Sequence, residues 1–325
     1  MNATENTPIL RLQGLCKNFP IGSFWGNHIR VIDHVDMDVG AGEIRGIVGE
    51  SGAGKSTLAR CSLRLLEPTS GSVYFCGEDL THLSASSLRA KRREFQMVFQ
   101  DPYASLNPGM TIAQILMEPL QVHKIGDREY RLRRIRESLD SVSLSESLMS
   151  RKPADLSGGQ QQRVGIARGL ILKPRLVIAD EPVSALDASV QAQILNLMAE
   201  LKRQYAHTLI LISHSLPAVH YLCTHISVLY RGRLVEEAPA EVFFREPKHP
   251  YSRALLDATL VLDPRKSNQV RSAMVNDAFH RDAVGCSFRP HCSYQLPICA
   301  QAIPRLSEVN KSETVACFLH SGEAI

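Results

Sequence analysis

Short apolar runs recur along the chain, and helical spacing follows several of them. Four of these runs, at 44–48, 96–99, 176–179 and 209–212, are mainly apolar without strict alternation, with Arg45 and Gln96 as their polar members. Continuous hydrophobicity is typical of strands in a parallel sheet, because helices cover such strands on both faces. The pattern therefore predicts an α/β chain, with a helix over 56–66 as the first that follows a strand.

Other segments depart from this alternation. Residues 72–75 and the pair 226–230 and 233–236, which turns at Arg231-Gly232, have the pattern of antiparallel hairpin strands. Residues 111–151 are rich in Leu, Glu and Arg at helical spacing, which predicts a mostly helical insertion.

The pattern loosens after about Leu260, and the polar segment 263–282 is typical of a linker. We therefore expect one large domain over residues 1–260, with its helical subdomain at about 105–165. A linker and a small C-terminal extension would fill residues 261–325.

Composition narrows the class of protein. With 44% hydrophobic and 22% charged residues, the 325-residue chain resembles an ordinary globular protein that buries a sizeable core. The formal net charge of +4 is too small to indicate nucleic acid as a partner. No apolar run approaches the ~18 residues of a membrane span, and the N-terminus lacks a signal-peptide pattern. We expect a cytosolic protein, or one bound to a membrane only through partners.

A glycine-rich loop follows the first predicted strand. Residues 49–57 read GESGAGKST and match the pattern G-x-x-x-x-G-K-[ST]. In this pattern backbone N–H groups converge on phosphate oxygens, the lysine reaches the β- and γ-phosphates, and the Ser hydroxyl ligates Mg²⁺. A glycine turn without a ligand is the alternative, which the flanking strand and helix disfavour. The candidate ATP-binding residues are Gly49, Ser51, Gly52, Gly54, Lys55, Ser56 and Thr57.

Two carboxylates end another predicted strand. Asp180 and Glu181 follow 176–179 directly, so they lie at the C-terminal edge of the sheet, where ligands bind in open α/β folds. Asp180 would hold Mg²⁺, and Glu181 would polarise the attacking water. Taken alone, a solvated strand end is the plainer interpretation; beside the glycine loop, the pair indicates ATP hydrolysis.

Further motifs carry a family resemblance. Residues 156–163 read LSGGQQQR, which resembles the signature of ABC ATPases; taken alone, LSGG would suit a helix cap. Gln100 follows a strand as the family's Q-loop glutamine does, and 184–187 (SALD) resembles the D-loop. His214 stands where the switch histidine does, although a lone His is more often a core residue. The resemblance covers about residues 8–260 and implies a P-loop NTPase fold with helical and antiparallel β subdomains.

The resemblance also implies a mechanism. Two cassettes would pair head to tail and hold ATP between the phosphate loop of one and the signature of the other. ATP would close the dimer and hydrolysis would reopen it. Besides Lys55, the catalytic residues would be Glu181 for the water, His214 for the γ-phosphate and Gln100, which also senses the nucleotide and ligates Mg²⁺. The residues facing the partner's ATP, at the positive end of a helix, would be Ser157, Gly158, Gly159 and Gln160.

An aromatic residue upstream should stack on adenine. Phe19, thirty residues before Gly49, best matches the family's position. Trp25 is an alternative because the intervening segment is long, and a core role for Phe19 is another. One residue departs from the family pattern: Ser215 follows His214, where the family usually carries an acidic residue. We expect it to change the tuning of the site and to leave activity in place.

Three segments resemble the oligopeptide, dipeptide and nickel importers in particular. They are the FQDPYASLNP stretch around Gln100, the EPVSALDASVQAQ stretch from Glu181, and the HPY triplet at 249–251, which alone would suit a loop turn equally well. The first form is similar to the second of the two ATPases that these systems usually carry. The resemblance implies peripheral binding at the cytoplasmic face of the inner membrane. The implied partners are a related second ATPase, two permease subunits and an extracytoplasmic solute-binding protein.

Four of the eight cysteines fall in the last forty residues, within a segment similar to the C-terminal extension of the peptide-importer ATPases. That resemblance implies a 4Fe–4S ligand set at Cys286, Cys292, Cys299 and Cys317. Thiolates also suit Zn²⁺, but the spacing lacks the close CxxC pairs of common zinc modules. Reduced, partly buried thiols are the plainer alternative, and His291 and His320 are further candidate ligands. The other four cysteines, Cys16, Cys61, Cys76 and Cys223, have the placement of small core residues.

Three other functions are alternatives to ATP-driven peptide import. A nickel or other small-solute importer would carry the same motifs, because cargo choice resides in other subunits. A non-transport ABC ATPase, acting in DNA repair or on ribosomes, usually has two cassettes or long coiled coils, and this chain has one cassette and no heptad run. A regulatory switch without turnover is disfavoured by the presence of Glu181 and His214.

Overall fold

The computed structural model describes residues 7–20, 28–260 and 284–320, and the chain forms two compact units. Each unit is assembled from three separate stretches of sequence. The first unit comprises 1–10, 39–44 and 74–213, and the second comprises 11–38, 45–73 and 214–325. The division into domains at 260/261 stays a prediction, and both Trp25 and the linker 263–282 lie outside the described residues.

A parallel sheet runs through the first unit. Its strands are β6 (Phe95–Val98), β7 (Leu176–Asp180) and β8 (Thr208–Ile212), with β7 in the middle and every residue of β7 and β8 buried. The register places Met97 opposite Ile178, and Ile178 opposite Ile210. The predicted buried, parallel strands are confirmed here. A short β5 (Glu78–Asp79) pairs antiparallel with the end of β4 (Ser70–Phe75).

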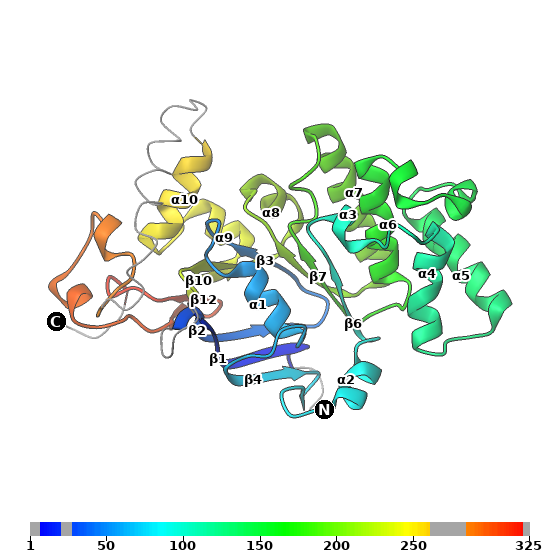
Figure 1. The fold of residues 1–325 in the computed structure, drawn as a ribbon. Helices are drawn as coiled ribbons and strands as arrows, with labels where there is room; N and C mark the ends of the chain where they lie inside the picture. Colours follow the sequence, from blue (N-terminus) through cyan, green and yellow to red (C-terminus); the bar gives the residue numbers. More distant parts are fainter. Residues whose placement is uncertain (1–6, 21–27, 261–283, 321–325) are drawn as a thin grey trace, which may run out of the picture. The chain divides into compact units, whose positions relative to one another are not determined.

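Helices make up most of the rest of the first unit, and the stretch 111–151 is helical as predicted (Figure 1). Its first helix begins at a capping box: Thr111 Oγ1 accepts the Gln114 N–H, and Gln114 Oε1 accepts the Thr111 N–H. Helices α4, α5 and α6 pack on one another. The helices are α2 (Ala85–Lys91), α3 (Pro102–Ser105), α4 (Ile112–Val122), α5 (Arg128–Ser141), the 3-10 turns η1 (Glu146–Ser150) and η2 (Pro153–Asp155), α6 (Gly158–Leu170) and α7 (Ala188–Tyr205).

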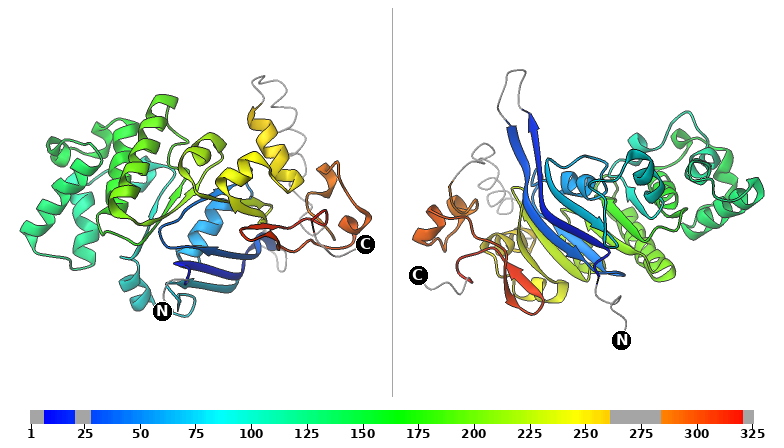
Figure 2. Two further views of the ribbon diagram at one scale, coloured as in Figure 1. Left: turned by 180° about the vertical axis from the view of Figure 1, so that it is seen from behind. Right: turned by 90° about the horizontal axis from the view of Figure 1, so that it is seen from below.

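The second unit holds strands of two sheets. One has the order β2-β1-β4, in which the long strands β1 (Leu10–Pro20) and β2 (His28–Val39) lie side by side (Figure 2). The other has the order β11-β12-β10-β9-β3. Strand β9 runs parallel to β3 and antiparallel to β10, which confirms the hairpin predicted at Arg231-Gly232. These strands are β3 (Ile44–Val48), β9 (His225–Tyr230), β10 (Arg233–Pro239), β11 (Ser307–Asn310) and β12 (Glu313–Val315).

Strand β12 ties the C-terminal extension to this second sheet, because Val315 lies opposite Glu236 of β10. The helices of the second unit are short. They are α1 (Lys55–Ser62), α8 (Leu216–Leu222), α9 (Ala240–Arg245), α10 (Pro250–Leu260) and the 3-10 turns η3 (Arg289–His291) and η4 (Pro297–Ala300). Among the described helices, none has the length and apolar character needed to cross a bilayer.

The helix predicted over 56–66 is α1, and its predicted end is wrong. The helix ends at Ser62 because Arg64 adopts a left-handed backbone with φ 45°. The N–H groups of Leu65 and Leu66 then both donate to the Arg60 carbonyl.

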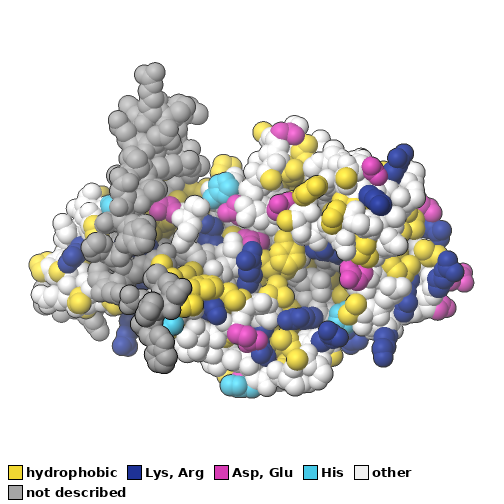
Figure 3. All heavy atoms as spheres, viewed as in Figure 1, with side chains coloured by type: hydrophobic (Ala, Val, Ile, Leu, Met, Phe, Trp, Pro, Cys, Tyr) yellow, Lys and Arg dark blue, Asp and Glu magenta, His cyan; other side chains and the backbone are white. Residues whose placement is uncertain are grey.

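Surface charge and the first four cysteines agree with the composition. Basic and acidic side chains are interspersed on the face drawn in Figure 3, in keeping with a net charge of only +4. Cys16, Cys61 and Cys223 are buried, as expected of small core residues, whereas Cys76 is half-buried.

Candidate functional site

The glycine-rich loop connects β3 to α1 in the second unit, as predicted. Gly49, Gly52 and Gly54 all have positive φ, at 152°, 80° and 105°. A side chain could not be added at two of them without moving backbone. A Cβ on Gly49 would lie 2.2 Å from the Leu229 carbonyl oxygen, and one on Gly54 would lie 2.8 Å from the Val31 carbonyl oxygen. The glycines are therefore required by the shape of the loop.

Lys55 opens α1 and folds back beneath the loop. Its Nζ donates to the carbonyl oxygens of Gly49 and Glu50, each at 2.8 Å, and the residue is 5% exposed. The crest of the loop at Ser51 and Gly52 is exposed. The loop thus combines an exposed crest with a buried ammonium, which is an arrangement suited to phosphate.

Two further groups of the second unit brace the loop, and sequence reasoning missed both. The Gly232 N–H, in the β9–β10 turn, donates to the Ala53 carbonyl at 2.9 Å. The Glu50 N–H donates to the hydroxyl of the fully buried Tyr251 at 3.0 Å. The HPY triplet contains Tyr251, but as a sequence pattern it indicates only the subfamily.

The two carboxylates end β7 in the first unit. Asp180 is 1% exposed, whereas Glu181 is half-buried and has a left-handed φ of 46°. The Glu181 N–H donates to the Ile212 carbonyl at 2.9 Å. Gln100 approaches from the loop after β6, where its Nε2 donates to Glu181 Oε2 at 3.2 Å. The structure therefore brings together two of the predicted catalytic side chains.

The signature segment begins α6 in the same unit. Ser157 is its N-cap: Oγ accepts the Gln160 N–H at 3.3 Å, and Gln160 Oε1 accepts the Ser157 N–H at 3.0 Å. Ser157 and Gly158 are exposed, so the positive end of this 13-residue helix is open to a ligand. The segment is a helix cap, and an exposed helix N-terminus is also suited to phosphate.

The other predicted nucleotide residues lie in the second unit. His214 lies two residues after the end of β8 and is exposed. Phe19, near the end of β1, is half-buried, and Lys17 Nζ lies 5.1 Å from the centre of its ring. Phe19 is thus a surface aromatic rather than one of the fully buried core residues. The predicted set is divided between the units: Gln100, Asp180, Glu181 and Ser157–Gln160 belong to the first, and Phe19, the loop with Ser56 and Thr57, and His214 belong to the second.

The four C-terminal cysteines gather around one small cavity, which His249, Pro250 and Phe288 also line. Burial raises the pKa of the Cys317 thiol to about 11, and proximity to the other three sulfurs adds to the shift. Burial likewise raises the pKa of Cys286. The chain places four soft donors together, although their spacing along the sequence is wide. The four cysteines are Cys286, Cys292, Cys299 and Cys317, all free.

The extension's two candidate histidines differ. His320 Nε2 lies 3.1 Å from the Lys248 carbonyl oxygen, so it already has a partner. His291 Nε2 is buried and has no hydrogen-bond partner among the described residues.

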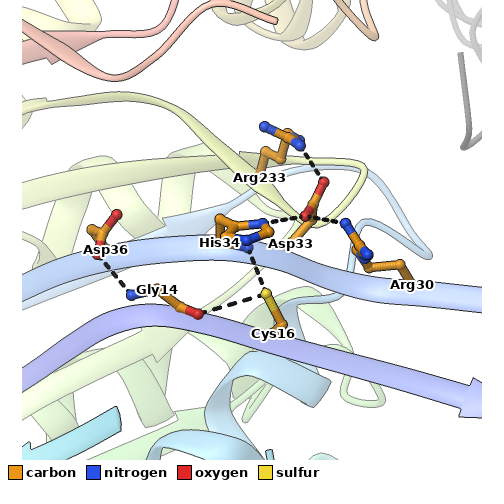
Figure 4. Close-up of polar contacts among 7 residues, drawn as sticks. All are labelled: Gly14, Cys16, Arg30, Asp33, His34, Asp36 and Arg233. Atoms are coloured by element: carbon orange, nitrogen blue, oxygen red, sulfur yellow. Dashed lines mark hydrogen bonds and ion pairs between the residues drawn. The ribbon is translucent and has the colours of Figure 1, made fainter. Parts of the chain in front are cut away.

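Among the described residues, one group places three metal-ligand atoms within 4.8 Å of one another, and it lies outside the extension: Cys16, Asp33 and His34 (Figure 4). Asp33 Oδ1 accepts from His34 Nδ1 at 2.7 Å and from Arg30 at 3.0 Å, and Arg233 pairs with Oδ2. Burial alone would raise the pKa of Asp33, but these donors together hold it below its ordinary value. Two guanidinium groups on one carboxylate oppose a bound cation, so this cluster is an ion-pair network that joins β2 to β10.

Two family models match the chain. Residues 32–184 match the ABC transporter family, and residues 235–299 match the oligopeptide/dipeptide transporter C-terminal region. The first match includes the glycine loop, the signature segment and the paired carboxylates. The second includes the HPY triplet and three of the four C-terminal cysteines.

Similar proteins and structures agree with these matches. A peptide import ATP-binding protein of Brucella ovis is 44% identical over 96% of this chain and 98% of its own. The oligopeptide transport ATP-binding protein AppF of Bacillus subtilis is 41% identical over 99% of this chain and 100% of its own. A dimeric ATP-binding cassette bound to ADP and phosphate has a TM-score of 0.65 at 31% identity, covering 71% of this chain and 98% of that one. The cbiO1 subunit of Clostridium perfringens has the same TM-score at 26% identity, over 82% and 100% of the two chains.

Proposed function

The chain belongs to the ATP-binding subunits of the oligopeptide and dipeptide ABC transporters, which makes it an ATPase that energises peptide import, and on this premise we propose which residues bind and hydrolyse the nucleotide. The observation that carries the assignment is the glycine loop between β3 and α1, with the buried ammonium of Lys55 beneath it. No other segment of the described chain combines a glycine loop, a lysine and the start of a helix in this way.

The loop holds the triphosphate. Its N–H groups and Lys55 neutralise the β- and γ-phosphates, and Phe19 stacks on adenine from the end of β1. Mg²⁺ would supply positive charge that stabilises the negative charge developing on the phosphates. The Ser56 hydroxyl, the Asp180 carboxylate and the Gln100 amide are the oxygen donors that would hold it, and oxygen donors are what this cation prefers.

Hydrolysis depends on Glu181 and His214. Glu181 accepts a proton from the attacking water, and its hydrogen bond from Gln100 Nε2 orients the carboxylate for this. His214 donates to the γ-phosphate oxygens as their charge develops. Ser157, Gly158, Gly159 and Gln160 serve the nucleotide held by the other ATPase subunit, because the open end of α6 attracts phosphate.

Replacing the base tests the assignment. Glu181→Gln keeps the size of the side chain and removes its basicity, so we expect ATP turnover to fall at least 100-fold while ATP still binds. Glu129→Gln, at an exposed position in α5, is the matched control and should keep wild-type turnover. Undiminished hydrolysis by Glu181→Gln would remove Glu181 from the mechanism.

The partners follow from the family. Importer ATPases of this family work with transmembrane permeases, and we propose a complex at the cytoplasmic face of the bacterial inner membrane. In it this chain pairs with a related second ATPase on two permease subunits served by an extracytoplasmic solute-binding protein. Co-purification in mild detergent, followed by mass spectrometry, should recover all of them. Recovery of a homodimer on the permeases would refute the second ATPase and keep the transport role.

The four-thiol cavity supports a second cofactor, which we propose is a 4Fe–4S cluster held by Cys286, Cys292, Cys299 and Cys317. Four soft donors around one cavity suit either iron–sulfur or zinc. A tetrahedral zinc with Zn–S bonds of about 2.3 Å needs its sulfurs about 3.8 Å apart. In this extension no three of the sulfurs lie within 4.8 Å of one another, which favours the wider ligand set of a cluster.

Metal analysis tests this cofactor. Protein purified without oxygen should contain about four iron and four sulfide per chain and absorb broadly in the visible range. Cys299→Ser should lose iron, whereas Cys76→Ser, outside the extension, should keep it. Stoichiometric zinc would replace the cluster by a zinc site, and folded, colourless, metal-free protein would refute both.

A further inference from the structure

The phosphate loop is held in place by Tyr251, a residue that is distant from it in the sequence. The Glu50 N–H donates to the Tyr251 hydroxyl at 3.0 Å, and Tyr251 is 0% exposed. The same peptide unit has its carbonyl, that of Gly49, in a hydrogen bond from Lys55 Nζ at 2.8 Å. One peptide plane is therefore held at both ends, by Tyr251 at its N–H and by the phosphate-binding lysine at its oxygen.

Tyr251 is itself firmly held. Its own N–H donates to His249 Nδ1 at 3.0 Å, at the start of α10. The N–H groups of Lys248 and His249 donate to the two carboxylate oxygens of Glu236, each at 2.8 Å, and Glu236 is 1% exposed. The Tyr251 ring packs against Tyr230, with centroids 4.4 Å apart. A side chain fixed at its backbone, its ring and its hydroxyl has little freedom to follow a moving loop.

We propose that Tyr251 is a positioning residue for ATP binding: its hydroxyl sets the orientation of the Gly49–Glu50 peptide, and through it the anchor of Lys55. This inference rests on the phosphate-loop assignment proposed above. Backbone donors bind phosphate best when they already point at it, because no reorganisation is then needed on binding. Without the hydroxyl, the Gly49–Glu50 peptide can rotate, and the Gly49 carbonyl then no longer holds the Lys55 ammonium in one position.

The C-terminal extension shares in this support. Phe288 packs against both Tyr251 and Tyr230, at centroid distances of 5.6 and 5.5 Å. Phe288 also lines the four-thiol cavity, together with His249 and Pro250. The extension is thus in direct contact with the residue that braces the loop, and the HPY triplet joins the two.

A single-atom change tests the proposal in the full-length chain. Tyr251→Phe keeps the ring and removes the hydroxyl, so we expect the KM for ATP and the Kd for ADP to rise roughly two- to tenfold. We expect kcat to change less than twofold, because Glu181 and His214 are untouched. Tyr230→Phe removes the same atom from the neighbouring ring and should leave both affinities within twofold of wild type.

The outcomes separate this inference from the function on which it rests. Unchanged affinities in Tyr251→Phe would overturn the proposal, whatever the melting temperature does, and so would an equal loss in Tyr230→Phe. Lys55→Ala should abolish tight ATP binding; if it does while Tyr251→Phe binds normally, the loop assignment stands and the inference fails. If Lys55→Ala binds normally, the loop assignment itself fails.

Hydrogen exchange gives a test that needs no variant. In the nucleotide-free wild-type protein the Glu50 amide should exchange at least tenfold more slowly than the amide of Ser51, an exposed residue. Exchange of the Glu50 amide at the rate of a free peptide would overturn the proposal.

Discussion

Replacing Gly54 with alanine should disable the phosphate loop. Gly54 precedes α1 with φ 105°, a conformation that L-residues rarely adopt. Its new Cβ would lie 2.8 Å from the Val31 carbonyl oxygen and 2.9 Å from Ile32 Cδ1. The Ile32 side chain could rotate, but the Val31 carbonyl belongs to β2, so the loop has to move away.

The loss of stability has two sources, the disfavoured backbone conformation at position 54 and the overlap of the new Cβ with neighbouring atoms. A non-glycine residue held in a disfavoured backbone region costs about 1–3 kcal/mol. Overlap with well-packed neighbours adds about 1–3 kcal/mol. We therefore expect the free energy of unfolding to fall by about 2–6 kcal/mol. If only 1.4 kcal/mol of this strain is expressed as displacement of the loop, ATP affinity falls about tenfold.

Chemical denaturation and equilibrium nucleotide binding measure the two effects separately. Gly165→Ala is the matched control, because nothing lies within 4 Å of a Cβ at Gly165 in α6. In a helix interior this change should stabilise the protein by about 0.5–1 kcal/mol. The reasoning is refuted if Gly54→Ala has wild-type stability and binds ATP with wild-type affinity.

Three further predictions concern the framework around the site. Glu236→Ala leaves the buried N–H of His249 and the partly buried N–H of Lys248 without their acceptor, and should lower the free energy of unfolding in urea by about 2–4 kcal/mol. Burial lowers the pKa of His207 to about 4. Between pH 6.5 and about pH 4 the unfolded chain therefore binds a proton that the folded chain does not bind. The free energy of unfolding should fall as the pH falls through this window, and it should fall less in His207→Leu. Arg168 Nη1 donates to the Ser105 carbonyl at 2.6 Å. Arg168→Met removes this bond, so hydrogen exchange should become faster in α3, the helix after Gln100. Helix α2 serves as the internal reference.

Some of the fold could be predicted because local pattern and final environment agree. Strand β7 is an unbroken apolar run in the sequence and is buried at every residue in the structure. The long strands β1 and β2 were missed because positive φ at Gly14 and His34 interrupts their alternation. Strands β11 and β12 were missed for another reason: their residues are mostly polar or half-exposed, and their pairing depends on β10.

The candidate site divides in the same way. Residues that touch a phosphate or a metal fall into short motifs, because chemistry requires particular groups at particular spacings, so Lys55 and Glu181 could be named from sequence. Gly232 and Tyr251 instead form hydrogen bonds with the phosphate loop, from which they are distant in sequence. A glycine in a hairpin turn and a tyrosine in a triplet carry no local mark of that role.

The bond between Glu50 and Tyr251 joins residues that are 201 positions apart. A ribosome that adds about 5–20 residues per second takes about 10–40 s to travel from one to the other. During that interval the Glu50 amide cannot make this bond, because Tyr251 has not yet been synthesised. The native hydrogen bonds of the phosphate loop can therefore be complete only after residue 251 has been made.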